Sequence, residues 1–279
     1  MRKSTPLDGT SLRSRGIRVV AVPRRGFVRG IHFNVEVAPT DDLRVRRALI
    51  AAVDADELSK RVFGGVYPAA RQLLVRGTLY YDRNAEQFYK GGMEEARRLL
   101  ESAGWRVGPG GIRSKGGDRL RVRIVTFPGL LGQAPVEFVQ AKWRELGVDT
   151  EVRIVGGAAY TPELTRPGVE VNGGLVASYD VDPVPLLWRF YHSSNYGVSN
   201  YSHIRDRELD RLLERAMQAT DDRERAMAVR DVQRWIAGRG LVLPLYENAF
   251  LLGVGPQVRD VWFDPRGNPL LWTTRLVGP

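Results

Sequence analysis

One stretch of the chain, residues 175–213, concentrates side chains that could hold a ligand. It continues an apolar run that predicts a buried strand, and it ends in a helix that begins near Asp206. Between these elements lie about twenty residues rich in Tyr, Asp, Asn and Ser, and long connections of this kind are often functional. Flat aromatic rings beside carboxylates and amides suit the wall of a ligand cleft. The candidate binding residues here are Tyr179, Asp180, Asp182, Trp188, His192, Asn200 and Tyr201.

The same side chains also have a purely structural interpretation. Aromatic residues commonly fill a core, and acidic residues commonly cap turns. Asp182 followed by Pro183 is typical of a turn, and a histidine such as His192 is more often a surface or turn residue than a ligand contact. From the residues alone, both interpretations stay open.

The sequence contains no recognisable catalytic constellation. Its three histidines, at positions 32, 192 and 203, show no metal-binding spacing, and Ser194 and Ser199 lie outside a G-x-S-x-G frame. Cysteine is absent, which excludes disulfides, thiol catalysis and cysteine-based metal sites. We therefore predict a protein that is not an enzyme and that uses no cofactor or metal ion.

The net charge of +10 raises the alternative of a nucleic-acid-binding domain. However, only five of the 42 basic residues are lysines, and the arginines are spread over every segment with no dense tract. Arg119, Arg121 and Arg123 alternate with apolar residues, as on the solvent-facing side of a half-buried strand. We interpret the excess as a compositional preference for arginine and expect no nucleic-acid partner, so this alternative ranks lowest.

The elements around the candidate stretch predict an α/β fold. Residues 120–126 and 148–155 are expected to be strands, and the helix that begins near Pro135 and ends at Gly147 joins them. A strand, a helix and a strand with short connections form a βαβ unit, so the two strands should be parallel. Further helices are expected at 41–53, 56–64, 93–103, 206–219 and 221–236.

Short strands at both ends of the chain do not make a domain by themselves. They are expected at 17–22, 28–37, 250–254, 261–263 and 270–272. We therefore expect three parts: residues 1–38, with terminal strands of a separate body and a hinge; 39–246, the α/β body; and 247–279, which return to the separate body. Residues 1–16 lack the apolar run of a secretory signal, so we expect no such signal in them.

Four passages, in order along the chain, resemble the extracellular solute-binding proteins of family 5, the dipeptide, oligopeptide and nickel type that serves ABC importers. They are FNVEVAPTDDLRVRRALIAAVDADELSKRVFGGVYPA at 33–69, MEEARRLLESAGW at 93–105, SYDVDP at 178–183 with NYSHIRDRELDRLLERAMQATDDRER at 200–225, and VQRWIAGRGLVLPLYENAFLLGVGPQV at 232–258. The first passage ends in a glycine-rich turn that adds Tyr67 to the candidate ligand-binding residues.

This resemblance implies a periplasmic-binding-protein-like (type II) lobe, with a mixed sheet and flanking helices. In the family, two such lobes are joined by two crossing segments and close on the solute between them without breaking a bond. The chain is expected to hold the second lobe and short segments of a first lobe that is otherwise missing. The implied partners are a small-molecule or peptide solute, an ABC permease in the membrane, and the missing N-terminal lobe or a second copy of the chain. The implied location is the periplasm or the extracellular face, although the chain shows no signal peptide or lipobox.

The chain departs from the family pattern at the position that matters for peptides. Peptide-binding relatives often place an aspartate three residues before the Asp of Asp-Pro, where it pairs with the peptide's amino group. In this chain that position is Tyr179, with Asp180 beside it. A phenol offers an ammonium only an oxygen or a cation–π contact, so a peptide-type solute is an expectation from the resemblance and not from this residue.

An alternative within the same fold is a ligand-sensing or interaction module that reuses the lobe. If the first lobe is absent, apolar surface on the two end segments is exposed, and we expect self-association or marginal solubility.

Overall fold

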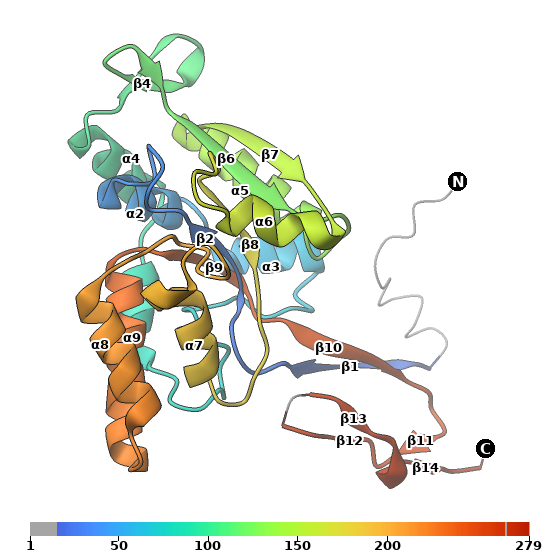
Figure 1. Cartoon of the computed structure of the whole chain (residues 1–279). Coiled ribbons are helices and arrows are strands. Elements are labelled where there is room, and N and C mark those ends of the chain that lie inside the picture. The colour runs from blue at the N-terminus through green and yellow to red at the C-terminus, as the bar shows by residue number, and fades with distance from the viewer. Residues whose placement is uncertain (1–15, 266, 279) are drawn as a thin grey trace.

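A five-stranded mixed sheet forms the centre of the molecule, whose computed structural model describes residues 16–265 and 267–278 (Figure 1). Its strands lie in the order β7 (Asp149–Ile154), β6 (Arg121–Thr126), β8 (Gly173–Val176), β2 (Arg29–Phe33) and β9 (Val242–Tyr246). β6 is parallel to β7 and β8, whereas β2 is antiparallel to β8 and β9. The helix α5 (Gln133–Leu146) joins β6 to β7, which confirms the predicted βαβ unit.

Helices cover both faces of this sheet. They are α2 (Leu43–Ala51), α3 (Ala55–Phe63), α4 (Met93–Ser102), α5, α6 (Tyr160–Thr165), α7 (Val184–Tyr191), α8 (Arg207–Gln218) and α9 (Asp222–Gly238). β2 shows the division, because Ile31 and Phe33 point into one core with α2 to α5, while His32 points to the other face and stacks on Tyr191 of α7. The second core also includes α8 and α9.

The predicted helix starts follow from aspartate caps. The side chains of Asp42, Asp54, Asp206 and Asp221 accept hydrogen bonds from backbone N–H groups in the first turns of α2, α3, α8 and α9. These bonds satisfy donors that a helix start otherwise leaves open, and the negative charge complements the helix dipole.

A two-stranded ribbon projects from the central sheet. β1 (Arg18–Pro23) pairs antiparallel with β10 (Ala249–Val254), and the short pairs β11 (Val258–Arg259) with β14 (Arg275–Leu276) and β12 (Trp262–Phe263) with β13 (Pro269–Leu270) follow it (Figure 1). A smaller sheet of β3 (Arg106–Val107), β4 (Arg113–Lys115) and β5 (Asp118–Arg119) lies at the opposite end of the molecule.

β2, which lies within the expected N-terminal part of residues 1–38, pairs with β8 and β9 in the central sheet. The stretch expected to be a loop after β8 contains α7, whose Leu187, Phe190 and Tyr191 are buried. The Asp182-Pro183 pair, which is typical of a turn, begins this helix: Asp182 Oδ1 accepts from the Val184 N–H at 2.9 Å.

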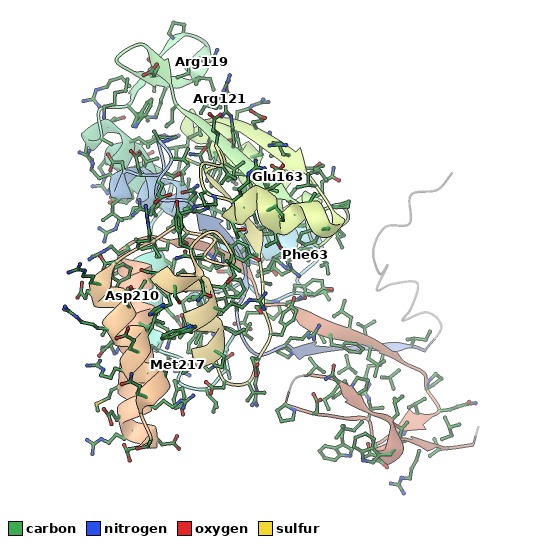
Figure 2. All side chains as sticks on the ribbon, viewed as in Figure 1. Phe63, Arg119, Arg121, Glu163, Asp210 and Met217 are labelled. Atoms are coloured by element: carbon green, nitrogen blue, oxygen red, sulfur yellow. The ribbon has the colours of Figure 1, made fainter. Side chains whose placement is uncertain are left out.

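The arginines of β6 behave as the alternation predicts. Arg121 is exposed, Arg123 is half-buried, and Leu120, Val122 and Ile124 are buried. Figure 2 shows Arg119 and Arg121 directed outward at the end of the sheet far from the ribbon. Arg121 pairs with Asp149 at 2.9 Å, so part of the positive charge here is neutralised locally. Within the described ranges, no helix is both long and apolar enough to cross a membrane.

Arg46 ties α2 to the end of α9. Its side chain is 5% exposed and donates to the carbonyls of Thr40 at 2.7 Å and Arg239 at 2.8 Å. Burial lowers the pKa of Arg46 to about 10, which still leaves it charged at neutral pH. The neighbouring Arg47 is exposed and donates to the Gly238 carbonyl at 2.8 Å.

Replacement of Arg46 by glutamine should lower the free energy of unfolding by about 2–3 kcal/mol, because the buried carbonyls lose charged donors. The matched variant Arg47→Gln should cost under about 0.5 kcal/mol, since its hydrogen bond is exposed to water. Urea denaturation of both variants checks this, and equal losses would contradict it.

His32 should make the fold sensitive to acid. Its ring is fully buried, and burial lowers its pKa from 6.5 to about 3. Between pH 6.5 and pH 3, His32 is protonated in the unfolded chain but neutral in the folded chain, and this protonation favours unfolding. The free energy of unfolding is therefore unaffected by the protonation of His32 above pH 6.5 and decreases as the pH falls toward 3. The loss between pH 7 and pH 5 should be about 2 kcal/mol. Urea denaturation at the two pH values measures it, and His32→Gln should remove that part of the dependence; an unchanged dependence in the variant would refute the assignment.

Candidate ligand-binding face

Two segments, residues 23–29 and 246–249, connect the central sheet to the β1–β10 ribbon, and we call them the crossing segments (Figure 1). They run side by side and antiparallel. The Arg24 N–H donates to the Asn248 carbonyl at 2.8 Å, and Arg29 lies opposite Tyr246. Because these are the only described connections between sheet and ribbon, a movement of one relative to the other must pass through them.

Tyr179, which follows β8, joins both crossing segments. Its hydroxyl accepts a hydrogen bond from Arg29 Nη2 at 3.0 Å and another from the side-chain amide of Asn248. The Arg24 guanidinium carbon lies 4.1 Å from the centroid of the Tyr179 ring, in a cation–π contact. Tyr179 is therefore held by residues from both segments.

The backbone around Tyr179 also meets the first crossing segment. Phe27 N–H donates to the Ser178 carbonyl at 2.8 Å, and Gly26 forms a β-bridge with Tyr179. Gly26 has φ +116°, and a Cβ there would lie 2.6 Å from the Ser178 carbonyl oxygen and 2.8 Å from the Tyr179 Cα. Only glycine fits this close approach.

An aromatic wall lies beside this junction. Phe127 follows β6 and its ring centroid is 5.0 Å from the Arg29 guanidinium carbon; Tyr160 begins α6, after β7, and packs edge-on against Phe127 at 5.8 Å. Burial raises the pKa of Tyr160 and of Tyr246, and the charge of Arg29 acts against this in both cases. The guanidinium thus lies within electrostatic reach of both phenols.

These residues share one edge of the sheet, which we call the binding edge: Arg24, Arg29, Phe127, Tyr160, Tyr179 and Tyr246. Phe127, Tyr160 and Tyr179 follow the carboxyl ends of the parallel strands β6, β7 and β8. Arg29 and Tyr246 lie on the parts of β2 and β9 that reach the same edge, and Arg24 lies on the crossing segment beside them. In open α/β sheets, ligands bind outside the carboxyl ends of the strands. All except Tyr246 are partly exposed, so they can touch a solute.

The structure brings two other predicted residues near this edge. Tyr67 is 7% exposed and packs against Phe63 and Tyr246, with ring centroids 4.9 Å and 5.7 Å away, so it supports the edge from behind. Figure 2 shows Phe63 between the sheet and the ribbon. Asp180 is half-buried beside Tyr179, and its Oδ1 accepts from the Val181 N–H at 2.7 Å.

The remaining predicted residues take part in the packing of α7 to α9. Asp182 pairs with Arg225 of α9 at 2.6 Å. Trp188 stacks on His192 at 3.7 Å, and His192 faces Asp210 and Glu214 of α8 at 3.8 Å and 3.6 Å.

Asn200 and Tyr201 are buried behind α7. Asn200 donates to the Ile204 carbonyl at 2.7 Å, and Tyr201 stacks on Phe190 at 5.1 Å. The physical reason for this separation is α7 itself, which folds the middle of the stretch onto α8 and leaves only its first residues at the binding edge.

Sequence reasoning missed Arg24, Arg29, Phe127 and Tyr160. Phe127 and Tyr160 could have been identified from the sequence, because each comes soon after a predicted strand of the βαβ unit. No local signal marks the arginines, which reach Tyr179 only because β2 pairs with β8.

Other parts of the surface are weaker candidates for a ligand site. A hollow of about 740 Å³ lies away from the binding edge, between α2, α3 and the 3₁₀ turn at Arg83–Tyr89. Several charged side chains of its wall are paired, as in Arg71 with Asp56 at 2.7 Å and Lys142 with Glu57 at 2.8 Å. Across the part of the chain that the structure describes, no group of three or more His, Asp or Glu side chains is placed to hold a metal ion.

Comparison with known proteins identifies the family. The sequence profile of the bacterial extracellular solute-binding proteins, family 5, middle region, matches residues 4–198. The chain belongs to this family. The predicted family membership is thereby confirmed.

The curated relatives in family 5 are longer than this chain. The haem-binding protein A of Haemophilus influenzae is 27% identical over 250 residues, which cover 89% of this chain and 44% of that protein. The chain spans about half the length, or less, of the curated relatives it matches.

Solved structures share the fold. NikA from Brucella suis in complex with Fe(III)-EDTA superposes with a TM-score of 0.83 at 20% identity, over 96% of this chain and 55% of that one. The oligopeptide-binding protein AppA from Bacillus subtilis, in complex with a nonapeptide, gives 0.81 at 19% identity, over 98% and 55%. These likenesses confirm the predicted periplasmic-binding-protein-like α/β fold with a mixed sheet.

Gly26→Ala should weaken the junction of Tyr179 with the crossing segment. It should cost about 3 kcal/mol of folding stability, since a methyl group meets backbone atoms in a strained conformation. Gly65 is the control, because its φ is +78° and no atom lies within 4 Å of the position that a Cβ would take. Gly65→Ala should cost only about 1 kcal/mol, from the left-handed backbone alone.

Hydrogen exchange of the Phe27 amide separates the two variants. Its protection should fall selectively in Gly26→Ala, because this amide donates to Ser178. Retained protection in Gly26→Ala would show that the junction does not depend on the glycine.

Proposed function

We propose that the chain supplies one lobe and both crossing segments of the solute-binding component of an ABC importer, and that the solute lies against the binding edge. The observation that carries this proposal is the convergence of Arg29, Phe127 and Tyr179 at the carboxyl ends of the parallel strands, where the crossing segments leave the sheet. Membership of family 5 and the shared fold support it.

The mechanism is capture without catalysis. The first lobe closes onto this second lobe about the crossing segments and buries the solute against the binding edge. The closed form is then delivered to a membrane permease. The edge contributes flat aromatic surface from Phe127 and Tyr160 and polar contacts from Arg29 and Tyr179. No bond of the solute is broken, so the protein acts as a binding module and not as an enzyme.

The ribbon and the C-terminal strand pairs belong, in this proposal, to the first lobe. Residues 16–28, 247–265 and 267–278 then lie on the first-lobe side, and the second lobe extends from β2 to β9. Apolar side chains on the C-terminal part support this division, because Leu271 is 67% exposed and Trp272 is 81% exposed. Exposed apolar surface of this kind is typical of a region that contacts further protein.

The partners follow from the same proposal. They are a peptide-type or other small solute, an ABC permease, and a first lobe, with the binding event on the periplasmic or extracellular side of the membrane. The haem, nickel, peptide and Fe(III)-EDTA named for relatives show how widely ligand chemistry varies among similar proteins.

Titration of the isotope-labelled chain with trialanine, followed by backbone amide NMR, tests the placement of the solute. Half of a cleft should bind weakly, with a Kd of about 1 mM or higher, because little of the ligand is enclosed. Shifts should appear in residues 24–29, 127, 160, 179 and 246–248. Shifts confined to the hollow near Arg71 and Lys142, or no shifts, would contradict the proposal.

A matched pair of variants sharpens the test. Phe127→Ala should weaken trialanine binding by about threefold to tenfold, as an aromatic contact is lost. Phe138→Ala, a half-buried phenylalanine on α5 outside the edge, should leave the affinity unchanged within about twofold.

A further inference from the structure

We infer that the binding edge recognises a carboxylate group of the solute through Arg24, Arg29 and the Tyr179 hydroxyl, so that the solute is an organic anion that needs no free amine. This inference rests on the proposed function, since it concerns the same edge. It assigns a charge to the ligand that neither the family nor the fold specifies.

The two arginines have unused donors. A guanidinium carries five N–H groups. Arg29 donates to Tyr179 through Nη2, and the Nε atoms of both Arg24 and Arg29 are buried without a hydrogen-bond partner. Among the residues that the structure describes, no ion pair includes either arginine, whereas Arg225 and Arg71 each have an aspartate.

The carboxylates nearest in sequence to the edge are engaged elsewhere. Asp180 accepts from the Val181 N–H at 2.7 Å. Glu247 is 4% exposed and accepts from the Arg76 N–H at 3.2 Å, and burial raises its pKa. Neither forms an ion pair within the described ranges, so neither of these two carboxylates is paired with Arg24 or Arg29.

The Tyr179 hydroxyl is oriented to donate. A phenol oxygen accepts through its lone pairs and donates its one proton. Arg29 and Asn248 both donate to this oxygen, so its accepting capacity is used and its proton remains for an acceptor. No hydrogen bond donated by this hydroxyl is found within residues 16–265 and 267–278. A carboxylate oxygen satisfies this geometry, whereas an ammonium group, which only donates, does not.

The arrangement thus combines a forked donor, a second cation and a hydroxyl proton. Arginine binds a carboxylate with two parallel hydrogen bonds, and charge-assisted bonds of this kind are stronger than neutral ones. The rings of Phe127 and Tyr160 lie next to Arg29, and an attraction between charges is stronger beside apolar surface than in open water.

Two peptides that differ only in their ends test the inference on the 279-residue chain. N-acetyl-trialanine has a free carboxylate and no amine, and trialanine amide has a free amine and no carboxylate. By amide NMR titration, the acetylated peptide should bind the edge at least about tenfold more tightly, as expected for a charge-assisted pair.

Arg29→Gln should weaken binding of N-acetyl-trialanine by about tenfold, because glutamine keeps hydrogen bonds but removes the charge. Arg18→Gln makes the same change of charge on the exposed part of β1 and should alter the affinity by less than about twofold. Unchanged amide shifts in β6 and β7 confirm that each variant is folded. If Arg29→Gln does not fold, the comparison of the two peptides on the unmodified chain decides.

The outcomes distinguish the two proposals. If trialanine amide binds the edge as tightly as N-acetyl-trialanine, the carboxylate inference fails while the proposed function stands. If unmodified trialanine and both blocked peptides leave the edge unperturbed, the proposed function fails and the inference fails with it.

Discussion

The architecture depends on one junction, where Tyr179 meets both crossing segments. The two segments pair with each other through Arg24 and Asn248, and the Tyr179 hydroxyl then bonds residues on both of them. The loop after β8 is thereby fixed to the only described connections between sheet and ribbon. A ligand that touches this loop therefore also touches the part of the molecule about which a first lobe would have to move.

The sheet explains why the junction lies where it does. β2 runs antiparallel to β8, so the start of one strand and the end of the other reach the same edge. β9 returns beside β2 and brings Tyr246 and Asn248 to the same place. Residues 150 positions apart in the chain, Arg29 and Tyr179, become neighbours through strand pairing alone.

Much of the fold was predictable from local patterns, and the site was predictable only in part. Aspartates at 42, 54, 206 and 221 marked helix starts correctly, because a cap is a local interaction. The position of β2 was not predictable in this way, since its partners lie far along the chain. Tyr179 stood out by its place after a buried strand, whereas Arg29 gained its role from a non-local pairing. α7 was missed because Asp182-Pro183 fits a turn and a helix start equally well.

The central claim is that a solute rests on the binding edge, against the Tyr179 junction. Intermolecular nuclear Overhauser effects from carbon-13-labelled N-acetyl-trialanine to the assigned side chains of the chain measure this contact directly. We expect effects from the peptide methyl groups to the rings of Phe127, Tyr160 and Tyr179. Effects to Met93 and other side chains of the separate hollow, with none to these three rings, would contradict the account.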